Sequence, residues 1–384
     1  MTDFFQVFTT TLALLFVIVW AAIFWAKLRI SRVVEKICRY PSEPVQDKVS
    51  IIIPVRNEEK TIKKCIESLL SQKGFSKEII VVDDNSTDST WEVAKTFIAE
   101  GVKLVRVGDL PAGWVGKTWA CNVGYENSTG EWLLFTDADT EFSDDVVVRA
   151  LNAAKSLSVD MLTFYPRLRF SSLLHKTVMP ILLTGLYFTG RPHVFSKGRS
   201  AFAFGSFMLI RRQGYERIGG HSAVRNAVLE DRAIAVRAMK TGLRAYFIDA
   251  TEKLTTSWND DSRSLWNGML RLFIPLFLNA DLKQFLVYFS LAAACFTIPL
   301  SVFLMGNYLA GFVSYAAAVL VLGHEARHHS ASVCHGLLWP LGVAAVAAAL
   351  LVAFYKSRTR PTVSWRGRKY FVEMGELHEV ATVC

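Results

Sequence analysis

The stretch Glu78-Ile-Ile-Val-Val-Asp83, followed by Asp84-Asn-Ser-Thr-Asp88, joins an apolar, β-branched run to an acidic turn. A short apolar run that ends in polar turn residues is typical of a buried strand. Three more strands are predicted on the same grounds, at Val49–Pro54, Val102–Val107 and Glu131–Thr136. Two intervening segments have helical spacing, Glu59–Gln72 and Ser89–Glu100. Apolar strands that alternate with helices predict an α/β fold with a doubly wound parallel sheet.

The chain is apolar at both ends. From Phe4 to Ala26 the clearly polar side chains are Gln6 and three threonines, so this segment is long enough to cross a bilayer. A cleaved signal peptide would carry positive charge before its apolar run, but here Asp3 precedes the run and the Lys/Arg residues follow it. We therefore predict an uncleaved transmembrane anchor, with the N-terminus outside and residues from Lys27 onward inside.

Three further apolar segments are long enough to span a membrane, at Phe285–Met305, Tyr308–Leu322 and Leu337–Tyr355. Two shorter ones, Leu270–Asn279 and Val178–Phe188, are predicted to lie at the membrane surface or in a protein core. Four complete crossings would place the basic tail outside, against the usual distribution of Lys and Arg. Either one of the three segments is re-entrant or interfacial, or the tail departs from that tendency. We predict a cytoplasmic tail.

The 384-residue chain is 52% hydrophobic and carries a net charge of +9, which raises the question of nucleic-acid binding. Its basic residues cluster just after the first and last apolar runs, where they set membrane orientation and contact anionic headgroups. The middle of the chain has no basic stripe interleaved with aromatic residues, so we expect no nucleic-acid partner. The six cysteines show neither paired nor metal-ligand spacing, which fits a reducing compartment.

Acidic residues follow the predicted strands. Asp84 is placed to accept hydrogen bonds from a nucleobase or ribose, although turn chemistry alone would also explain this segment. Asp137 and Asp139 stand at i and i+2 after a strand, where two carboxylates can share one divalent cation. An isolated pair of this kind is usually a solvated turn. Because three acidic strand ends recur at one edge of the predicted sheet, we expect Mg²⁺ or Mn²⁺ there, with a substrate diphosphate.

A further acidic pair, Glu230-Asp231, precedes the predicted helix Ala233–Thr241. Its charge could serve only the helix dipole. A transferase that acts on an acceptor hydroxyl needs a carboxylate to take up the proton, and we assign that role to Asp231, with Glu230 beside it.

Together these motifs resemble the family 2 glycosyltransferases over roughly residues 49–270. The matching residues occur in the family's order: Pro54, Asn57-Glu58, Asp83-Asp84-x-Ser86, Asp137-x-Asp139 and Glu230-Asp231. The resemblance implies a GT-A-like nucleotide-sugar-binding domain, a UDP-sugar donor and inversion at the anomeric carbon. It also implies that the donor is held by Pro54, Asn57, Glu58, Asp84, Lys117 and Asp137.

A narrower resemblance points to the carotenoid-type members, the hydroxychlorobactene and diaponeurosporenoate glucosyltransferases. It rests on three segments, Pro111–Asn122, Gly219-Gly220-His221 and Thr362–Arg368. It implies an integral membrane enzyme with a long apolar acceptor, and His221 is predicted to shape the acceptor pocket rather than to bind metal. The tail around Trp365 could equally be an interfacial anchor.

The chain departs from the processive members, whose Gln-x-x-Arg-Trp signature holds a growing polysaccharide. The corresponding stretch, Asp260–Trp266, keeps Arg263 and Trp266 without the motif, and both are retained as acceptor-side candidates. Single transfer to a lipid, with glucose as the expected sugar, is therefore favoured. The alternatives are a polyprenyl-phosphate sugar synthase, a polysaccharide synthase and a non-catalytic binding protein.

The predicted organisation is that of a multi-pass protein of the cell membrane with a cytoplasmic catalytic domain. Its parts are an anchor at 1–27, a linker at 28–48, the glycosyltransferase domain at 49–270, an interfacial helix and transmembrane helices at 271–355, and a basic tail at 356–384.

Overall fold

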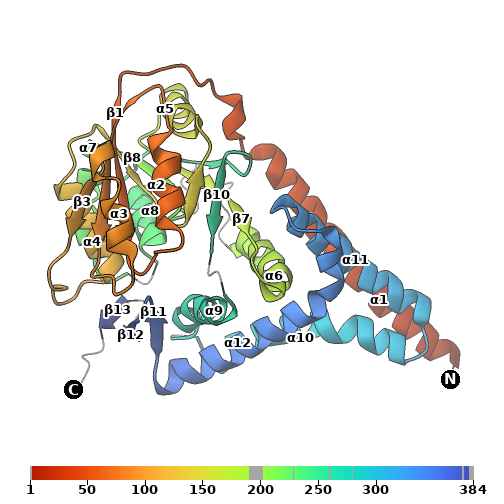
Figure 1. The fold of residues 1–384 in the computed structure, drawn as a ribbon. Helices are drawn as coiled ribbons and strands as arrows, with labels where there is room; N and C mark the ends of the chain where they lie inside the picture. The colour runs from red at the N-terminus through yellow and green to blue at the C-terminus, as the bar shows by residue number, and fades with distance from the viewer. Residues whose placement is uncertain are drawn as a thin grey trace. The chain divides into compact units, whose positions relative to one another are not determined.

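The computed structural model describes residues 2–189, 202–227, 229–258, 261–278, 280–373 and 376–379. The chain divides into two compact units (Figure 1). The α/β unit comprises residues 34–168, 190–258 and 364–384, and the helical unit comprises residues 1–33, 169–189 and 259–363. The predicted catalytic domain at 49–270 is therefore not continuous in space: residues 169–189 and 259–270 lie in the helical unit, while the tail from Ser364 joins the α/β unit.

The α/β unit is built on a seven-stranded sheet in the order β3-β2-β1-β4-β8-β6-β9. Its strands are β1 (Lys48–Val55), β2 (Ser76–Asp83), β3 (Lys103–Arg106), β4 (Trp132–Phe135), β6 (Met161–Tyr165), β8 (Met208–Arg211) and β9 (Ala245–Asp249). β1 pairs in parallel with β2 and β4, and β2 with β3, which confirms the four predicted strands. β8 runs antiparallel to both of its neighbours, so the sheet is mixed rather than wholly parallel.

Helices connect these strands. They are α2 (Ile62–Leu70), α3 (Thr90–Lys95), α4 (Gly116–Glu126), α5 (Val146–Ser156), α7 (Arg212–Arg217) and α8 (Glu230–Lys240), with short 3-10 turns η1 (Ile37–Arg39), η2 (Ile98–Glu100) and η4 (His221–Val224). α2 buries Ile62, Ile66 and Leu69, the apolar positions that predicted it. The helix predicted at Ser89–Glu100 is interrupted, because α3 ends at Lys95 and η2 follows.

The sheet buries apolar side chains on both faces, as expected for central parallel strands. Five residues of β1 are fully buried in sequence, from Val49 to Ile53. Their neighbours on β2 and β4 join one core with α2 and α5. This core fixes the strands, so the loops that follow their carboxyl ends have defined positions.

Two small sheets complete the α/β unit. One has the order β5-β10-β7, from β5 (Thr140–Phe142), β7 (Arg167–Arg169) and β10 (Leu254–Ser257). The other, formed by the tail, has the order β11-β12-β13, from β11 (Thr362–Trp365), β12 (Arg368–Glu373) and β13 (Glu376–Glu379). Arg366 and Gly367 link β11 to β12, and both have positive φ angles, as a two-residue hairpin of this kind requires. We call residues 364–373 the tail hairpin.

The helical unit contains α1 (Thr2–Val33), α6 (Leu173–Thr189), α9 (Ser262–Phe277), α10 (Leu282–Leu304), α11 (Tyr308–His328), η5 (Val333–Leu338) and α12 (Trp339–Thr359). Among the described residues, α1, α11 and Val333–Thr359 are each long and apolar enough to cross a membrane. α10 is bent by 45° between Cys295 and Thr297. Pro299 explains the bend, because it offers no backbone N–H to the carbonyl of Cys295 four residues earlier. α6, predicted as a surface or core helix, buries Val178, Met179 and Leu183 and packs on α12.

α1 and α11 run side by side in the same direction (Figure 1). At one end, the Asn307 side chain donates hydrogen bonds to Thr9 and Thr10. At the other end, Lys27 forms a buried ion pair with Glu325, while His329 Nε2 lies 3.5 Å from the same carboxylate. α11 therefore begins beside the start of α1 and ends beside the end of α1.

The chain reverses after α11 and returns along it. The backbone of Gly336 lies against Val319 and Gly323, and the Tyr315 hydroxyl donates to the carbonyl of Leu337. α12 thus begins beside the first half of α11, where the ring of Trp339 contacts Tyr315. It ends beside the start of α10, where Phe354 stacks on Phe285 with ring centroids 4.1 Å apart.

Candidate active site

The loops that follow β1 and β2 are bonded to each other. The Asn57 amide N–H donates to Ser86 Oγ (3.1 Å), and Asn57 Oδ1 accepts from the backbone of Thr87 (2.8 Å). Asn57 and Asn85 both have positive φ, a conformation that asparagine tolerates better than most residues. Pro54 lies within β1, in register with Val82 of β2. These bonds hold Glu58 and Asp84 at one edge of the sheet.

Asp84 is surrounded by arginines. Its Oδ2 lies 2.5 Å from Arg368 Nη1 and 4.0 Å from Arg56 Nη1, while Oδ1 has no hydrogen-bond partner among the described residues. Burial raises the pKa of Asp84 above its usual range, and the two guanidinium groups oppose the shift. Glu58 pairs with Arg366 of the tail hairpin and also accepts from Thr61 Oγ1 (2.9 Å). The predicted donor-binding carboxylates therefore both face guanidinium groups of the tail.

Lys117 joins the Asp137–Asp139 motif to the Glu230–Asp231 motif. Its Nζ lies 2.6 Å from Asp137 Oδ1 and 2.5 Å from Glu230 Oε1. Burial by itself would lower the pKa of Lys117, but the charges of Asp137, Glu230 and Asp231 raise it well above the usual value. A permanent cation at the start of α4 thus holds the end of β4 against the start of α8.

Asp231 is held by backbone donors. Its Oδ2 accepts from the Gly205 amide (3.0 Å) and its Oδ1 from the Arg232 amide (2.6 Å). Burial raises the pKa of Asp231 to about 7, with a further contribution from the charge of Glu230, while Lys117 partly opposes the shift. A carboxylate whose pKa lies near neutrality can both take up and release a proton under ordinary conditions, as a general base must.

Asp137 and Asp139 stand two residues apart, and the charge of Asp137 acts on Asp139 although Asp137 also pairs with Lys117. Asp139 Oδ1 accepts from Thr256 Oγ1 (2.9 Å), and its pKa is raised, first by burial and then by the charges of Asp137 and Glu58. Two carboxylates that interact electrostatically offer the oxygen ligands that a divalent cation prefers. Among the residues that the structure describes, no cluster of three metal-ligating side chains occurs. A cation bound here would therefore take further ligands from phosphate oxygens and water, as Mg²⁺ usually does.

His221 lies in the protein interior and not in an open pocket. It is fully buried, its Nδ1 lies 2.8 Å from the Tyr215 hydroxyl, and its ring contacts Phe135. Burial, followed by the charge of Lys117, lowers the pKa of His221 to about 3, so the ring is neutral. Its role toward the acceptor stays a prediction, and any such role would be exerted through the residues packed around it.

Arg263 and Trp266, the remaining acceptor candidates, lie in the first turns of α9 in the helical unit. Asp261 caps this helix by accepting from the backbone of Arg263 and Ser264 (both 2.8 Å). Asp260 lies outside the described residues. The assignment of Arg263 and Trp266 to the acceptor also stays a prediction.

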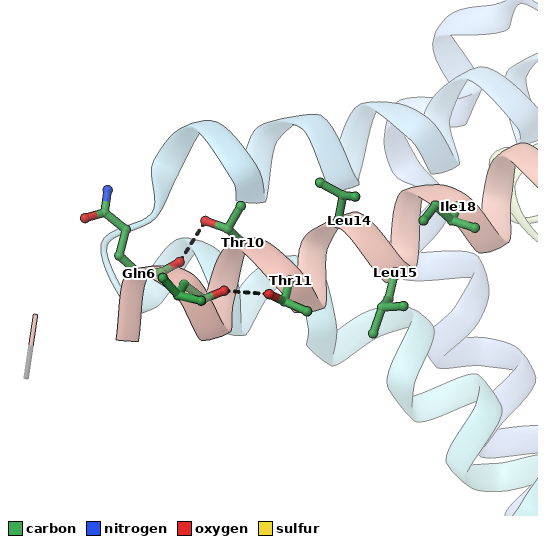
Figure 2. A pocket seen from close by; sticks show the side chains of 7 residues that line it. Gln6, Thr10, Thr11, Leu14, Leu15 and Ile18 are labelled. Atoms are coloured by element: carbon green, nitrogen blue, oxygen red, sulfur yellow. Dashed lines mark hydrogen bonds between the residues drawn. The ribbon is translucent and has the colours of Figure 1, made fainter. Parts of the chain in front are cut away.

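A groove of about 340 Å³ lies on α1 (Figure 2). It is lined by Gln6, Val7, Thr10, Thr11, Leu14, Leu15 and Ile18. The hydroxyls of Thr10 and Thr11 donate to carbonyls of the preceding turn, so the groove presents a mainly apolar surface. It lacks the carboxylates of the site described above.

Comparison with known proteins defines the class. The fold resembles that of a mannosyltransferase from Pyrobaculum calidifontis, solved with GDP-Man and Mn²⁺: the TM-score is 0.52 at 18% identity, over 91% of this chain and 99% of the other. This is the GT-A-like fold of nucleotide-sugar transferases. Residues 50–219 match the family described as Glycosyl transferase family 2. The matched segment carries Glu58, Asp84, Asp137 and Asp139, and the protein is a glycosyltransferase.

Among curated proteins, the chain is similar to 4,4′-diaponeurosporenoate glycosyltransferases of staphylococci. It is 30% identical to the Staphylococcus haemolyticus protein over 188 residues, which span about half of each chain (47% and 49%). It is 24% identical to the protein of Staphylococcus aureus strain bovine RF122 over 357 residues, 84% of this chain and 88% of the relative. Because it covers 84% of this chain, the longer alignment includes part of the helical unit as well as the α/β unit.

The structure adds residues to the site that the motifs do not indicate. The clustering of basic residues in the tail predicts that Arg366 and Arg368 contact lipid headgroups, but they pair with Glu58 and Asp84. Thr256 on β10 was not singled out, although it bonds to Asp139. Gly367 is followed by alternating polar and apolar residues from Arg368 to Val372, which is a sequence signal for a hairpin. This pattern does not indicate which part of the protein the hairpin contacts.

Proposed function

We propose that this protein is an inverting, non-processive membrane glycosyltransferase that moves a sugar, with glucose first to be tested, from a UDP-sugar to a lipid acceptor. The observation that carries the proposal is the Asp231 carboxylate, held by two backbone amides with a pKa of about 7, beside the Asp137–Lys117–Glu230 ion-pair chain. The similarity to diaponeurosporenoate glycosyltransferases supports an apolar, polyisoprenoid-like acceptor.

Each part of the reaction has a candidate residue. Asp84, with its unpartnered Oδ1, is suited to accept a hydrogen bond from the nucleobase. Asp137 and Asp139 would hold Mg²⁺ or Mn²⁺, which when bound would supply Lewis-acid stabilisation of the leaving diphosphate. Asp231 would take the proton of the acceptor hydroxyl as its oxygen bonds to the anomeric carbon and the bond to the diphosphate breaks. Attack from the face opposite the diphosphate inverts that carbon.

The first test measures transfer to lipid. Membranes that contain the protein are incubated with radiolabelled UDP-glucose and a lipid extract, with and without a chelator, and the lipids are extracted. We expect metal-dependent label in the lipid phase and at least about 100-fold less with Asp231→Asn, the scale of a lost general base. Asp144→Asn, at an exposed carboxylate that contacts Ser71, is the matched control. Absence of label with UDP-glucose and with other UDP-sugars would refute the donor assignment.

The same assay separates a hydroxyl acceptor from an acidic one. A hydroxyl must lose its proton during attack, so its transfer depends fully on Asp231. A carboxylic acid or a polyprenyl phosphate is already ionised at neutral pH and has less need of a base. Asp231→Asn is therefore expected to abolish transfer to alcohols and to spare part of the transfer to acids. If the lipid that the wild type labels is still labelled in part by Asp231→Asn, that lipid is an acid. It would then be a carboxylic acid such as the one named in the relatives, or a polyprenyl phosphate.

We further propose that α1, α10 and α11 cross the membrane, while η5 and α12 form a re-entrant segment. Chain connectivity supports this, since both α1 and α12 lead into the α/β unit. α11 runs parallel to α1, so its end at Glu325 is on the same side as Lys27. The chain must then enter and leave the membrane on that side before residue 364. The Lys/Arg residues after α1 favour the cytoplasm for the α/β unit and the tail.

A further inference from the structure

The tail hairpin delivers two arginines to the edge of the sheet where the nucleotide sugar is proposed to bind. Arg366 at the hairpin tip pairs with Glu58, and its own carbonyl accepts from Arg56 Nε (2.9 Å). Arg368, two residues on, pairs with Asp84. Tyr370, two residues after Arg368, anchors the hairpin: it is fully buried and accepts from the Gly116 amide (3.4 Å).

The contact at the start of α4 is unusually close. A Cβ on Gly116 would lie 2.1 Å from Arg368 Nη1 and 2.1 Å from Asp84 Oδ2, so only glycine leaves room for this ion pair. The pair therefore lies directly against the first turn of an 11-residue helix. The backbone N–H groups and dipole at such a helix start favour a phosphate group. In this structure the Asp84 carboxylate is the negative charge nearest to that position.

Positively charged groups gather at this point. Three guanidinium groups, those of Arg56, Arg366 and Arg368, contact the carboxylates of Glu58 and Asp84. Two further carboxylates, those of Asp83 and Asp139, lie within electrostatic range of this cluster. The side chains of Arg56 and Arg368 are only 13% and 12% exposed, so water screens them weakly. Weakly screened guanidinium groups beside a helix N-terminus are suited to bind an anion. Arginine is also the side chain whose geometry best matches a phosphate.

We propose that Arg368 and Arg366 bind the diphosphate of the sugar donor, and that Asp84 and Glu58 hold them in position while the donor is absent. This inference rests on the proposed function, because it names ligands for the same donor. When the donor enters, its nucleobase takes the Asp84 carboxylate, and Arg368 moves from that carboxylate to the phosphates at the start of α4. No covalent bond changes in this exchange. The tail hairpin is thus part of the donor site.

The test compares three probes with the full-length protein in detergent: UDP with Mg²⁺, inorganic diphosphate with Mg²⁺, and uridine. Binding is measured by calorimetry for the wild type, Arg368→Gln and Arg368→Lys. We expect Arg368→Gln to weaken binding of UDP and diphosphate about 10- to 100-fold, the loss of one charged hydrogen-bond pair. Uridine, which lacks phosphate, should bind the variant at least as well, and Arg368→Lys should recover part of the loss.

Lys369→Gln is the matched control. It removes one positive charge from the same strand at an exposed position whose side chain points away from Arg368. It should leave the affinity for all three probes unchanged.

Two results would overturn the inference. If Arg368→Gln binds UDP more tightly than the wild type, the arginine competes with the donor for Asp84 and does not bind phosphate. If Lys369→Gln weakens UDP as much as Arg368→Gln does, the effect is one of general charge. Wild-type protein that binds none of UDP, UDP-glucose or other UDP-sugars contradicts the proposed function itself. Uridine binding by Arg368→Gln shows that the variant is folded.

Discussion

At the scale of single residues, Asp231 determines how the reaction should depend on pH. Its pKa is raised from the usual carboxyl range to about 7, so the basic form increases as pH rises through neutrality. We expect kcat/KM for an alcohol acceptor to increase about tenfold per pH unit below 7 and to level off above it. Initial rates of transfer between pH 5 and pH 9 measure this directly.

Two variants identify the group that titrates. Glu230→Gln removes a negative charge that raises the pKa of Asp231, so the rising limb should move to lower pH. Lys117→Met removes a positive charge that lowers it, so the limb should move to higher pH. Both variants lose activity at their plateau, but the position of the limb is independent of that loss. If the rising part of the pH profile stays at the same pH in the wild type and both variants, the group that titrates is on a substrate and is not Asp231.

The sequence predicted which carboxylates gather at this edge of the sheet, because each follows a strand or opens a helix. It could not predict their partners. Lys117 was expected near the donor, but its position between Asp137 and Glu230 depends on how β4, α4 and α8 pack. The pairing of Arg368 with Asp84 joins residues 284 positions apart, and no local pattern encodes a contact over that separation.

At the scale of elements, the pair of α1 with α11 is held by a buried ion pair. The side chains of Lys27 and Glu325 are 7% and 3% exposed, and Thr184 of α6 lies 3.4 Å from Lys27 Nζ. Removal of one partner takes the opposite charge of the pair away from a buried ion, which costs about 3–5 kcal/mol. We expect Glu325→Gln and Lys27→Met each to lower the thermal unfolding temperature in detergent.

The double variant Lys27→Met/Glu325→Leu separates this cause from lost packing. An apolar pair of similar size can replace a buried ion pair at little cost, so it should be more stable than either single variant. Arg29→Met, at an exposed cation of the same helix that stacks on Trp25, should change the unfolding temperature little. Single variants as stable as the wild type would show that the pair does not hold α1 to α11.

Hydropathy located every long helix of this unit but not the path of the chain between them. The segment predicted at Leu337–Tyr355 is α12 together with the last residues of η5, and its length suits a complete crossing. The reversal before it depends on Gly323 and Gly336, which allow two backbones to approach closely. Hydropathy does not report the close packing of small residues. From the sequence, a re-entrant segment is therefore only one of the alternatives for the membrane path.

At the scale of the whole molecule, the proposed membrane path predicts which loops can be labelled from outside. In a variant without native cysteines, Met305→Cys lies in the exposed turn between α10 and α11, and Ser330→Cys lies just after α11. We expect an impermeant maleimide to label Met305→Cys in intact cells and Ser330→Cys only after permeabilisation. Labelling of Ser330→Cys in intact cells would contradict this path, because the end of α11 would then lie outside and not on the side of Lys27.

The tail hairpin also bears on how the enzyme is made. Its contact with Arg56 spans 310 residues, so β1 and β2 leave the ribosome long before their partner does. Between the two, α6 and the helices from α9 to α12 of the helical unit must be translated. If Arg366 and Arg368 bind the donor, a nascent or misinserted chain lacks a complete nucleotide-sugar site. Catalytic competence then arises only after membrane integration, which would keep immature chains from consuming activated sugar.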